Sequence, residues 1–159
     1  MWVRALSPVR AEDDRGVAGL EDVAASFRGT GVRVRVIDEL SPRSLTEAAE
    51  LLMYRTVQEG LTNALRHCRA RSVDIRVSAV DRGALVTVTN DIPVELRPRV
   101  PRAPVGGEGG ASAGFGLGGL SERAAELGGS VTAGRDDDSF RLALTLPPRE
   151  VVALGREAS

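Results

Sequence analysis

Apolar side chains recur at helical spacing in three parts of the chain. In residues 12–29 they lie three or four positions apart, which predicts an amphipathic helix. A longer helix is predicted to begin at a capping box formed by Ser44 and Glu47 and to run to about His67. A third helix follows a glycine-rich turn and runs to about Leu127. We therefore expect about three helices.

Elsewhere apolar and polar residues alternate, which is the pattern of a strand with one buried face. The alternating runs are 32–36, 72–80, 84–89, 130–133 and 140–146. The second and third runs are separated by three turn-forming residues, so they predict a hairpin. The order of the elements predicts an α/β two-layer sandwich, in which about three helices cover one face of a mixed sheet of about five strands.

A long segment between the hairpin and the third helix has no periodicity. Residues 94–113 are rich in proline and then in Gly, Ala and Ser. A loop of this length inside a compact domain is usually a functional lid or a disordered segment, and we favour the lid. The chain then divides into a linker over residues 1–11, one domain over residues 12–148 and a tail over residues 149–159.

Composition excludes several classes of partner. Basic and acidic residues nearly balance, at 21 and 22, so no net field favours nucleic acid or an anionic membrane. A single cysteine, Cys68, cannot form an internal disulfide or a paired thiol site for zinc, which fits a reducing cytoplasm. No apolar run approaches the roughly 20 residues that cross a bilayer. We therefore expect no direct membrane contact from this segment.

The second half of the long helix separates into an apolar stripe and a polar arc. The stripe is formed by Val57, Leu61, Ala64, Leu65 and Cys68. The arc is formed by Glu59, Asn63, Arg66 and His67. An ordinary solvated helix face would explain the arc. Asn63 argues for more, because Asn is a poor helix former and its place in mid-helix indicates a side chain with a partner.

The segment from Tyr54 to His67, YRTVQEGLTNALRH, closely resembles the N box of bacterial sensor histidine kinases, in the subfamily with short dimerising acceptor domains and helix-turn-helix response regulators. The resemblance implies that Asn63 binds the Mg²⁺ that bridges the nucleotide phosphates. It implies that Glu59 acts as a general base or orients the nucleophile, and that Arg66 faces the phosphates. His67 completes the same nucleotide-binding motif.

A glycine-rich motif precedes the third helix. It consists of Gly114, Phe115, Gly116, Leu117 and Gly118. Backbone N–H groups at the start of a helix could hold a phosphate there. The motif also fits G-x-G-x-x-G, but a dinucleotide fold needs a strand directly before it and an acidic residue ending the next strand, and the sequence predicts neither.

The continuation of this motif to Gly129 resembles the G2 box of the same kinases and follows the N box in the expected order. Together the two motifs make a resemblance that covers residues 10–147. It implies the Bergerat-type ATP-binding fold shared with gyrase-type and Hsp90-type ATPases, with ATP and Mg²⁺ as ligands and residues 94–113 as the ATP lid.

One position departs from the family pattern. The family usually has an Asp that accepts a hydrogen bond from the adenine amino group, closely followed by Gly. Here Asn90 aligns with the Asp and Ile92 with the Gly, although Asp91 could serve after a shift of one residue. Because an amide oxygen can also accept, we expect weakened nucleotide affinity and not a lost site. The alternative is that Asn90 simply ends a strand.

The resemblance also implies a phosphoacceptor that this sequence lacks. His67 is the one histidine and lies inside the nucleotide motif, so we do not expect it to be the acceptor. Residues 1–11 are too short for the dimerising domain. We expect either a piece of a longer protein or a chain that acts on the histidine of a partner, in the cytoplasm, with a response regulator as the second partner.

Two other functions fit the same fold. An anti-sigma-type serine kinase uses a related fold to bind and phosphorylate partner proteins, but the N box favours the histidine kinase. A degenerate nucleotide-binding or interaction module is suggested by Asn90 and Ile92.

Overall fold

The computed structural model describes residues 16–97 and 114–153. In this part of the chain the α-helices are α1 (Gly19–Arg28), α2 (Glu47–Arg66) and α3 (Gly114–Glu126). Short 3₁₀ helices are η2 (Gly16–Ala18), η3 (Val94–Leu96) and η4 (Pro148–Glu150). The predicted linker, most of the predicted lid and the first residues of the first predicted helix lie outside the described residues.

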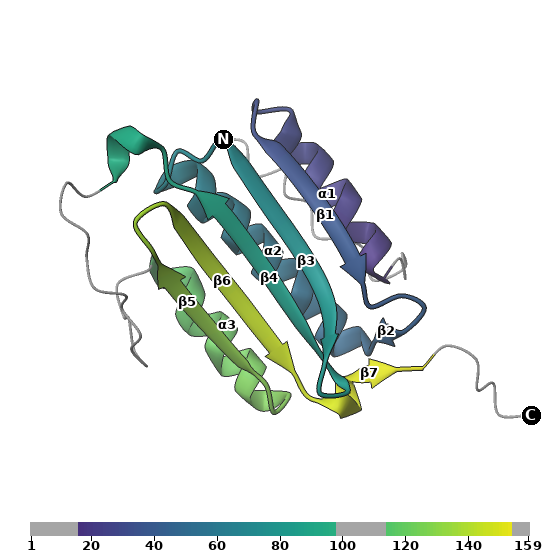
Figure 1. Cartoon of the computed structure of the whole chain (residues 1–159). Coiled ribbons are helices and arrows are strands. Elements are labelled where there is room, and N and C mark those ends of the chain that lie inside the picture. Colours follow the sequence, from purple (N-terminus) through teal and green to yellow (C-terminus); the bar gives the residue numbers. More distant parts are fainter. Residues whose placement is uncertain (1–15, 98–113, 154–159) are drawn as a thin grey trace, which may run out of the picture.

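Five strands form the main sheet, as the alternating pattern predicts. They are β1 (Arg33–Glu39), β3 (Ser72–Val80), β4 (Gly83–Asp91), β5 (Ser130–Arg135) and β6 (Ser139–Leu146). Their order across the sheet is β1-β3-β4-β6-β5, with β1 parallel to β3 and the other neighbours antiparallel. The fold is therefore the predicted two-layer α/β sandwich with a mixed sheet (Figure 1).

The predicted hairpin is formed by β3 and β4. Its turn residues Asp81 and Arg82 have φ angles of 49° and 67°, the left-handed conformation that a two-residue hairpin turn needs. Gly83 then begins β4 where a side chain would not fit, because a Cβ there would lie 2.1 Å from the carbonyl oxygen of Leu146.

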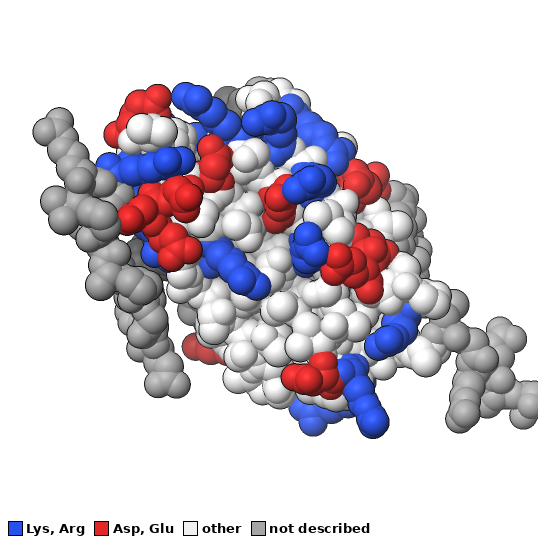
Figure 2. Space-filling view, in the orientation of Figure 1, with Lys and Arg blue, Asp and Glu red and all other residues white. Residues whose placement is uncertain are grey.

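The helices cover one face of the sheet and leave the other face open (Figure 1). The largest fully buried side chains of the sheet point toward the helices, among them Ile75, Val77, Leu142 and Leu144. The open face carries charged residues of both signs, which Figure 2 shows as a mixture over the visible side of the molecule. One pair joins Arg35 to Asp74, whose hydrogen bonds and charge raise the pKa of the guanidinium.

The start of α2 differs from the prediction. Ser44 does not cap the helix, because Ser44 and Leu45 form β2 (Ser44–Leu45), a strand that pairs with β7 (Val151–Val152). Thr46 is the N-cap instead, and its hydroxyl oxygen accepts the N–H of Ala49 at 3.3 Å. The predicted capping box of Ser44 and Glu47 was therefore wrong.

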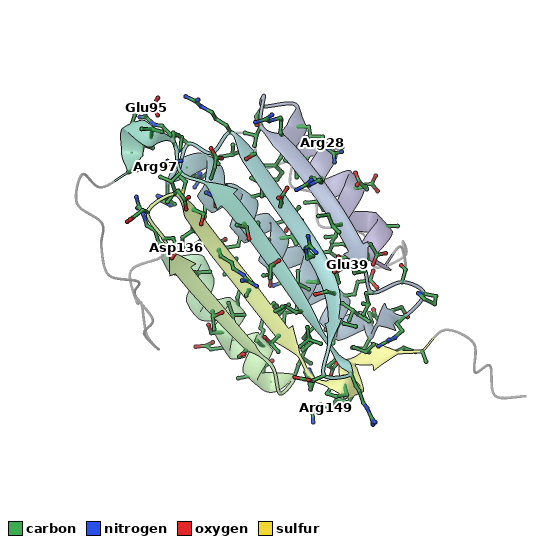
Figure 3. All side chains as sticks on the ribbon, in the orientation of Figure 1. Arg28, Glu39, Glu95, Arg97, Asp136 and Arg149 are labelled. Atoms are coloured by element: carbon green, nitrogen blue, oxygen red, sulfur yellow. The ribbon has the colours of Figure 1, made fainter. Side chains whose placement is uncertain are left out.

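The predicted C-terminal tail contributes to the fold through residues 149–152. The Thr46 hydroxyl donates a hydrogen bond to the carboxylate of Glu150, which is 9% exposed. Arg149, labelled in Figure 3, donates to the carbonyl oxygen of Leu127 at 2.8 Å, beyond the end of α3. Within the described part of the chain, no helix has the length and apolar character that crossing a membrane requires.

Candidate functional site

Three separate elements bring the two predicted motifs to one end of the molecule. The C-terminal end of α2, the C-terminal end of β4 and the N-terminal end of α3 all lie at the end from which η3 projects (Figure 1). Contacts between α2 and β4, and between α2 and α3, hold these elements together. Asn63, Asn90 and the first turn of α3 are therefore gathered at the same end of the fold.

The second half of α2 presents the predicted apolar stripe and one unexpected buried amide. Of the stripe, Leu65 is half-buried and the other four residues are buried. Asn63 is only 9% exposed, although it lies on the predicted polar arc. Its side chain has no hydrogen-bond partner among the residues that the structure describes. A solvated helix face therefore does not explain Asn63.

The remaining residues of the polar arc are more accessible. Glu59 is half-buried, whereas Arg66 and His67 are exposed. His67 caps the C-terminal end of α2, where its N–H donates to the carbonyl oxygen of Asn63 at 2.9 Å. The polar arc therefore combines one buried amide with a half-buried carboxylate and two exposed side chains.

Gly60 lets α2 approach the sheet closely. A Cβ built at Gly60 would lie 2.8 Å from Cγ1 of Val88 on β4. Val88 is 1% exposed and lies two residues before Asn90 on the same face of the strand. The glycine inside the first motif therefore sets the distance between the helix that carries Asn63 and the strand that carries Asn90.

Asn90 combines deep burial with an unused hydrogen-bonding atom. It is 2% exposed and is paired in the sheet with Val73 and Phe140. Its side-chain Nδ2 donates to the carbonyl oxygen of Asp91 at 2.8 Å. Its Oδ1 is the single fully buried side-chain nitrogen or oxygen, among the described residues, that has no hydrogen-bond partner. Asn90 therefore has a buried acceptor that is free to receive a hydrogen bond from a ligand.

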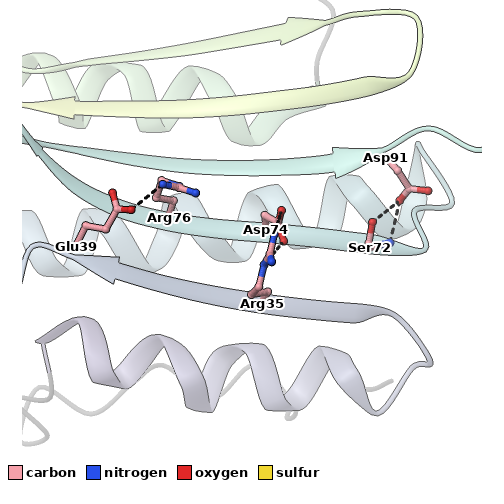
Figure 4. A network of polar contacts seen from close by, with 6 residues as sticks. All are labelled: Arg35, Glu39, Ser72, Asp74, Arg76 and Asp91. Atoms are coloured by element: carbon pink, nitrogen blue, oxygen red, sulfur yellow. Dashed lines mark hydrogen bonds and ion pairs between the residues drawn. The ribbon is translucent and has the colours of Figure 1, made fainter.

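Asp91 lies on the opposite face of the sheet from Asn90, because successive side chains of a strand alternate. Its Oδ1 accepts hydrogen bonds from the backbone N–H groups of Arg71 and Ser72, each at 2.8 Å. Figure 4 shows this contact on the open face, beyond the Arg35–Asp74 pair. The structure therefore does not bring Asp91 together with the other predicted nucleotide-binding residues.

Three arginines, two of them distant in the sequence, hold the start of the predicted lid. Arg97 donates through Nε to the carbonyl oxygen of Ile92 at 2.8 Å, and Arg135 donates to that of Leu96 at 3.3 Å. Arg71 forms an ion pair with Glu95, with 3.5 Å between nitrogen and oxygen. Figure 3 shows Glu95 and Arg97 at this end of the molecule. The sequence analysis missed these contacts, since nothing local to each arginine indicates its partner.

The sequence suggested that the glycine motif is a turn that precedes the third helix. In the structure the motif forms the first turns of α3 itself. The helix begins at Gly114, so the N–H groups at its start have no partner within the helix. Leu117 is half-buried and Gly118 is exposed, with open space around the position of a Cβ. The predicted phosphate-binding backbone is therefore the N-terminal end of a helix, where the helix dipole favours an anion.

The oxygen atoms available at this end of the fold are compatible with a magnesium ion that is held mainly by the phosphates of a bound nucleotide. In the described ranges, no group of three or more His, Cys, Asp and Glu side chains could hold a metal. Mg²⁺ commonly takes one or two protein oxygens and fills its octahedral shell with phosphate oxygens and water. The amide oxygen of Asn63 fits that requirement.

Comparisons with known proteins agree with this arrangement. Residues 48–150 match a family described as histidine kinase-, DNA gyrase B- and HSP90-like ATPases. The methanol utilization control sensor protein MoxY of Paracoccus denitrificans is 29% identical over 136 residues, which cover 80% of this chain and 28% of that protein. The signal transduction histidine-protein kinase/phosphatase UhpB of Salmonella typhimurium is 30% identical over 115 residues, which cover 72% of this chain and 20% of that protein.

A solved structure has the same fold. The histidine kinase domain of the blue-light activated histidine kinase from Erythrobacter litoralis EL346 superposes with a TM-score of 0.58 at 20% identity. The match covers 84% of this chain and 65% of that one. The chain spans less than a third of the length of MoxY and less than a third of the length of UhpB.

Proposed function

Because this chain belongs to the family of histidine kinase-, DNA gyrase B- and HSP90-like ATPases, we propose that it is the ATP-binding catalytic domain of a sensor histidine kinase. It transfers the γ-phosphoryl group of ATP to a histidine on a separate acceptor domain, for relay to a response regulator. The observation that carries the proposal is that α2 and β4 each have a buried amide, Asn63 and Asn90, near their C-terminal ends, which lie at the end of the fold where α3 begins. The name of one relative, the histidine-protein kinase/phosphatase UhpB, supports a histidine as the acceptor.

Each element supplies one part of the nucleotide site. Oδ1 of Asn90 accepts a hydrogen bond from the base, and the backbone N–H groups at Gly114–Gly118 hold phosphate. The Asn63 oxygen would hold a Mg²⁺, and the bound ion would supply positive charge beside the phosphates. Arg66 and His67 are exposed at the C-terminal end of α2, where the Arg66 guanidinium attracts the triphosphate.

The acceptor histidine comes from outside the chain. His67 ends the helix that carries Asn63, and its backbone is fixed by a hydrogen bond to that residue. Glu59, half-buried one helical turn before Asn63, orients the incoming imidazole or accepts its proton. The partner is a histidine-bearing dimerisation domain, in the same polypeptide or another. Since ATP and response regulators are intracellular, the domain works in the cytoplasm.

Calorimetry with ATP and Mg²⁺ tests the site. Asn63→Ala should abolish magnesium-dependent ATP binding while leaving the fold intact by circular dichroism. Glu47→Ala is the control, because Glu47 is exposed in the first turn of the same helix and lies outside the first motif. Undiminished affinity in the Asn63 variant would refute the assignment.

The chemical class of the acceptor needs a second experiment. Incubation with γ-labelled ATP and a supplied histidine-bearing acceptor domain should give phosphate that acid removes. Acid-stable label on a partner protein would instead indicate a serine kinase. Binding of ATP without transfer to any supplied acceptor would favour a degenerate nucleotide-binding module.

A further inference from the structure

Two consecutive residues after β6 contact the ends of two helices. Arg149 donates through Nη2 to the carbonyl oxygen of Leu127 at 2.8 Å, just beyond the C-terminal end of α3. The carboxylate of Glu150 accepts a hydrogen bond from the hydroxyl of Thr46, the N-cap of α2, and the backbone carbonyl of Glu150 accepts the N–H of Thr46 at 2.9 Å. Arg149 and Glu150 both belong to η4, so one short turn joins the end of α3 to the start of α2. We call these two residues the η4 clamp.

The surroundings of the η4 clamp hold it in place. Glu150 is 9% exposed, and its N–H donates to the carbonyl oxygen of Pro147 at 3.0 Å. Gly128, with a φ of 79°, leaves room for the guanidinium, because a Cβ there would lie 2.5 Å from Nη2 of Arg149. The guanidinium is also a cation at the negative end of the α3 dipole, which favours the contact. The η4 clamp is therefore a fixed connection between the two helices.

The opposite ends of the same two helices carry the proposed contacts to the nucleotide. α2 leads from the η4 clamp to Asn63, and α3 leads from Gly114 to the η4 clamp. Figure 3 shows Arg149 at the end of the molecule opposite to the start of the predicted lid. At 1.5 Å per residue the helices are about 30 Å and about 20 Å long. Since helices move as rigid elements, a change of angle at the clamped ends displaces Asn63 relative to the start of α3.

We propose that Arg149 and Glu150 are positioning residues for the nucleotide site, which hold α2 and α3 at the spacing that lets one magnesium-bound triphosphate contact both helices. The inference rests on the proposed function, because it assumes that Asn63 holds the Mg²⁺ and that the start of α3 holds phosphate. Without Mg²⁺ the triphosphate offers no partner to the Asn63 oxygen, so of the two helices it contacts α3 alone. Only binding with Mg²⁺ therefore depends on the distance between the helices.

Calorimetry on the full chain separates positioning from general stability. Arg149→Ala should weaken ATP binding about threefold or more with Mg²⁺ present, and should leave it unchanged when EDTA removes the metal. Arg149→Lys should restore most of the lost affinity, since an ammonium group can also donate to the carbonyl oxygen of Leu127. Arg43→Ala is the control, because Arg43 is exposed one residue before β2 and its side chain has no hydrogen bond or ion pair within the described part of the chain.

Two results would overturn the inference and leave the proposed function standing. One is an Arg149→Ala variant that binds ATP with Mg²⁺ as tightly as the original chain does. The other is an equal loss of affinity with and without Mg²⁺, because a clamp that only stabilises the fold does not distinguish the two conditions. If the original chain binds no nucleotide, the proposed function fails and this inference fails with it.

Hydrogen exchange gives a measurement without a variant, should Arg149→Ala fail to fold. Coupling between two sites is reciprocal, so ATP with Mg²⁺ should slow exchange of the Thr46 N–H, which donates to Glu150. The Arg43 N–H, which donates to the carbonyl oxygen of Leu40 at 3.0 Å, is the reference for general stabilisation by the ligand. ATP without Mg²⁺ should slow the Thr46 N–H no more than the reference. A Thr46 N–H that ATP with Mg²⁺ slows no more than the reference would overturn the inference.

Discussion

Gly60 offers a direct test of how closely α2 must approach the sheet. Replacing it with Ala would place a Cβ 2.8, 2.9 and 3.1 Å from the Cγ1, Cβ and Cγ2 atoms of Val88. Val88 is 1% exposed, lies in the middle of the sheet and is β-branched, so it has little freedom to rotate away. The helix and the strand must therefore move apart, or one of them must distort.

Two opposing effects set the magnitude. Overpacking a core costs about 1–3 kcal/mol, and the rigid contact with Val88 argues for the upper half of that range. Ala in place of Gly favours the helix by about 1 kcal/mol. Gly60→Ala should thus lower the free energy of unfolding by about 1–2 kcal/mol, which corresponds to roughly 2–8 °C in Tm for a chain of this size.

Urea and thermal unfolding followed by circular dichroism would measure the effect. Gly119→Ala is the matched control, because Gly119 is also helical but has open space around the new Cβ, so this variant should gain about 0.5–1 kcal/mol. Adding Val88→Ala to the Gly60 variant should cost less than Val88→Ala alone, by at least about 0.5 kcal/mol. A Gly60→Ala variant as stable as the original chain would refute the close-contact argument.

Two further predictions concern the ends of α2 and of β1. Thr46→Ala should lower stability by about 1 kcal/mol in urea unfolding, since it removes the N-cap and the hydrogen bond to Glu150. Desolvation raises the pKa of Asp38, but hydrogen bonds from the Ser41 hydroxyl and the N–H groups of Ser41 and Leu40 outweigh it and hold the pKa below its usual value. The stability difference between the original chain and Asp38→Ala should therefore be full near neutral pH and shrink as the pH falls through that lowered pKa, and a difference that grew in acid would contradict the assignment.

The main sheet and its helices were predictable because each of these elements shows a periodic pattern of apolar residues within its own segment of the sequence. The β2–β7 sheet was not, since its strands of two residues, Ser44–Leu45 and Val151–Val152, are too short to show alternation and lie far apart in the chain. The same pairing explains the misplaced N-cap. Ser44 and Thr46 are both good caps, and only the tertiary contact with β7 decides which of them begins the helix.

At the candidate site, the sequence motifs named residues on elements that meet at one end of the fold, but they did not indicate how those residues are buried or paired. Asn63 was expected on an exposed arc because the apolar stripe of α2 covers one side only. In the structure α2 contacts α1 as well as α3 and the sheet, so its buried face is wider than the stripe. Likewise, the sequence did not show which of Asn90 and Asp91 faces the helices. The register of β4 decides this, because it places adjacent side chains on opposite faces of the sheet.

The unpaired oxygen of Asn90 lowers the stability of the free chain but favours binding of a ligand that donates a hydrogen bond to it. A buried acceptor without a partner costs about 1–3 kcal/mol, which a ligand that donates to it would restore. Asn90→Val should therefore unfold at a higher temperature than the original chain, because it removes the unpaired atom and suits a strand, yet it should bind ATP much more weakly. The Val variant also loses the hydrogen bond from Nδ2 to the carbonyl oxygen of Asp91, so ATP affinity is the deciding measurement. Undiminished ATP binding would show that Asn90 is a structural residue that does not contact the base.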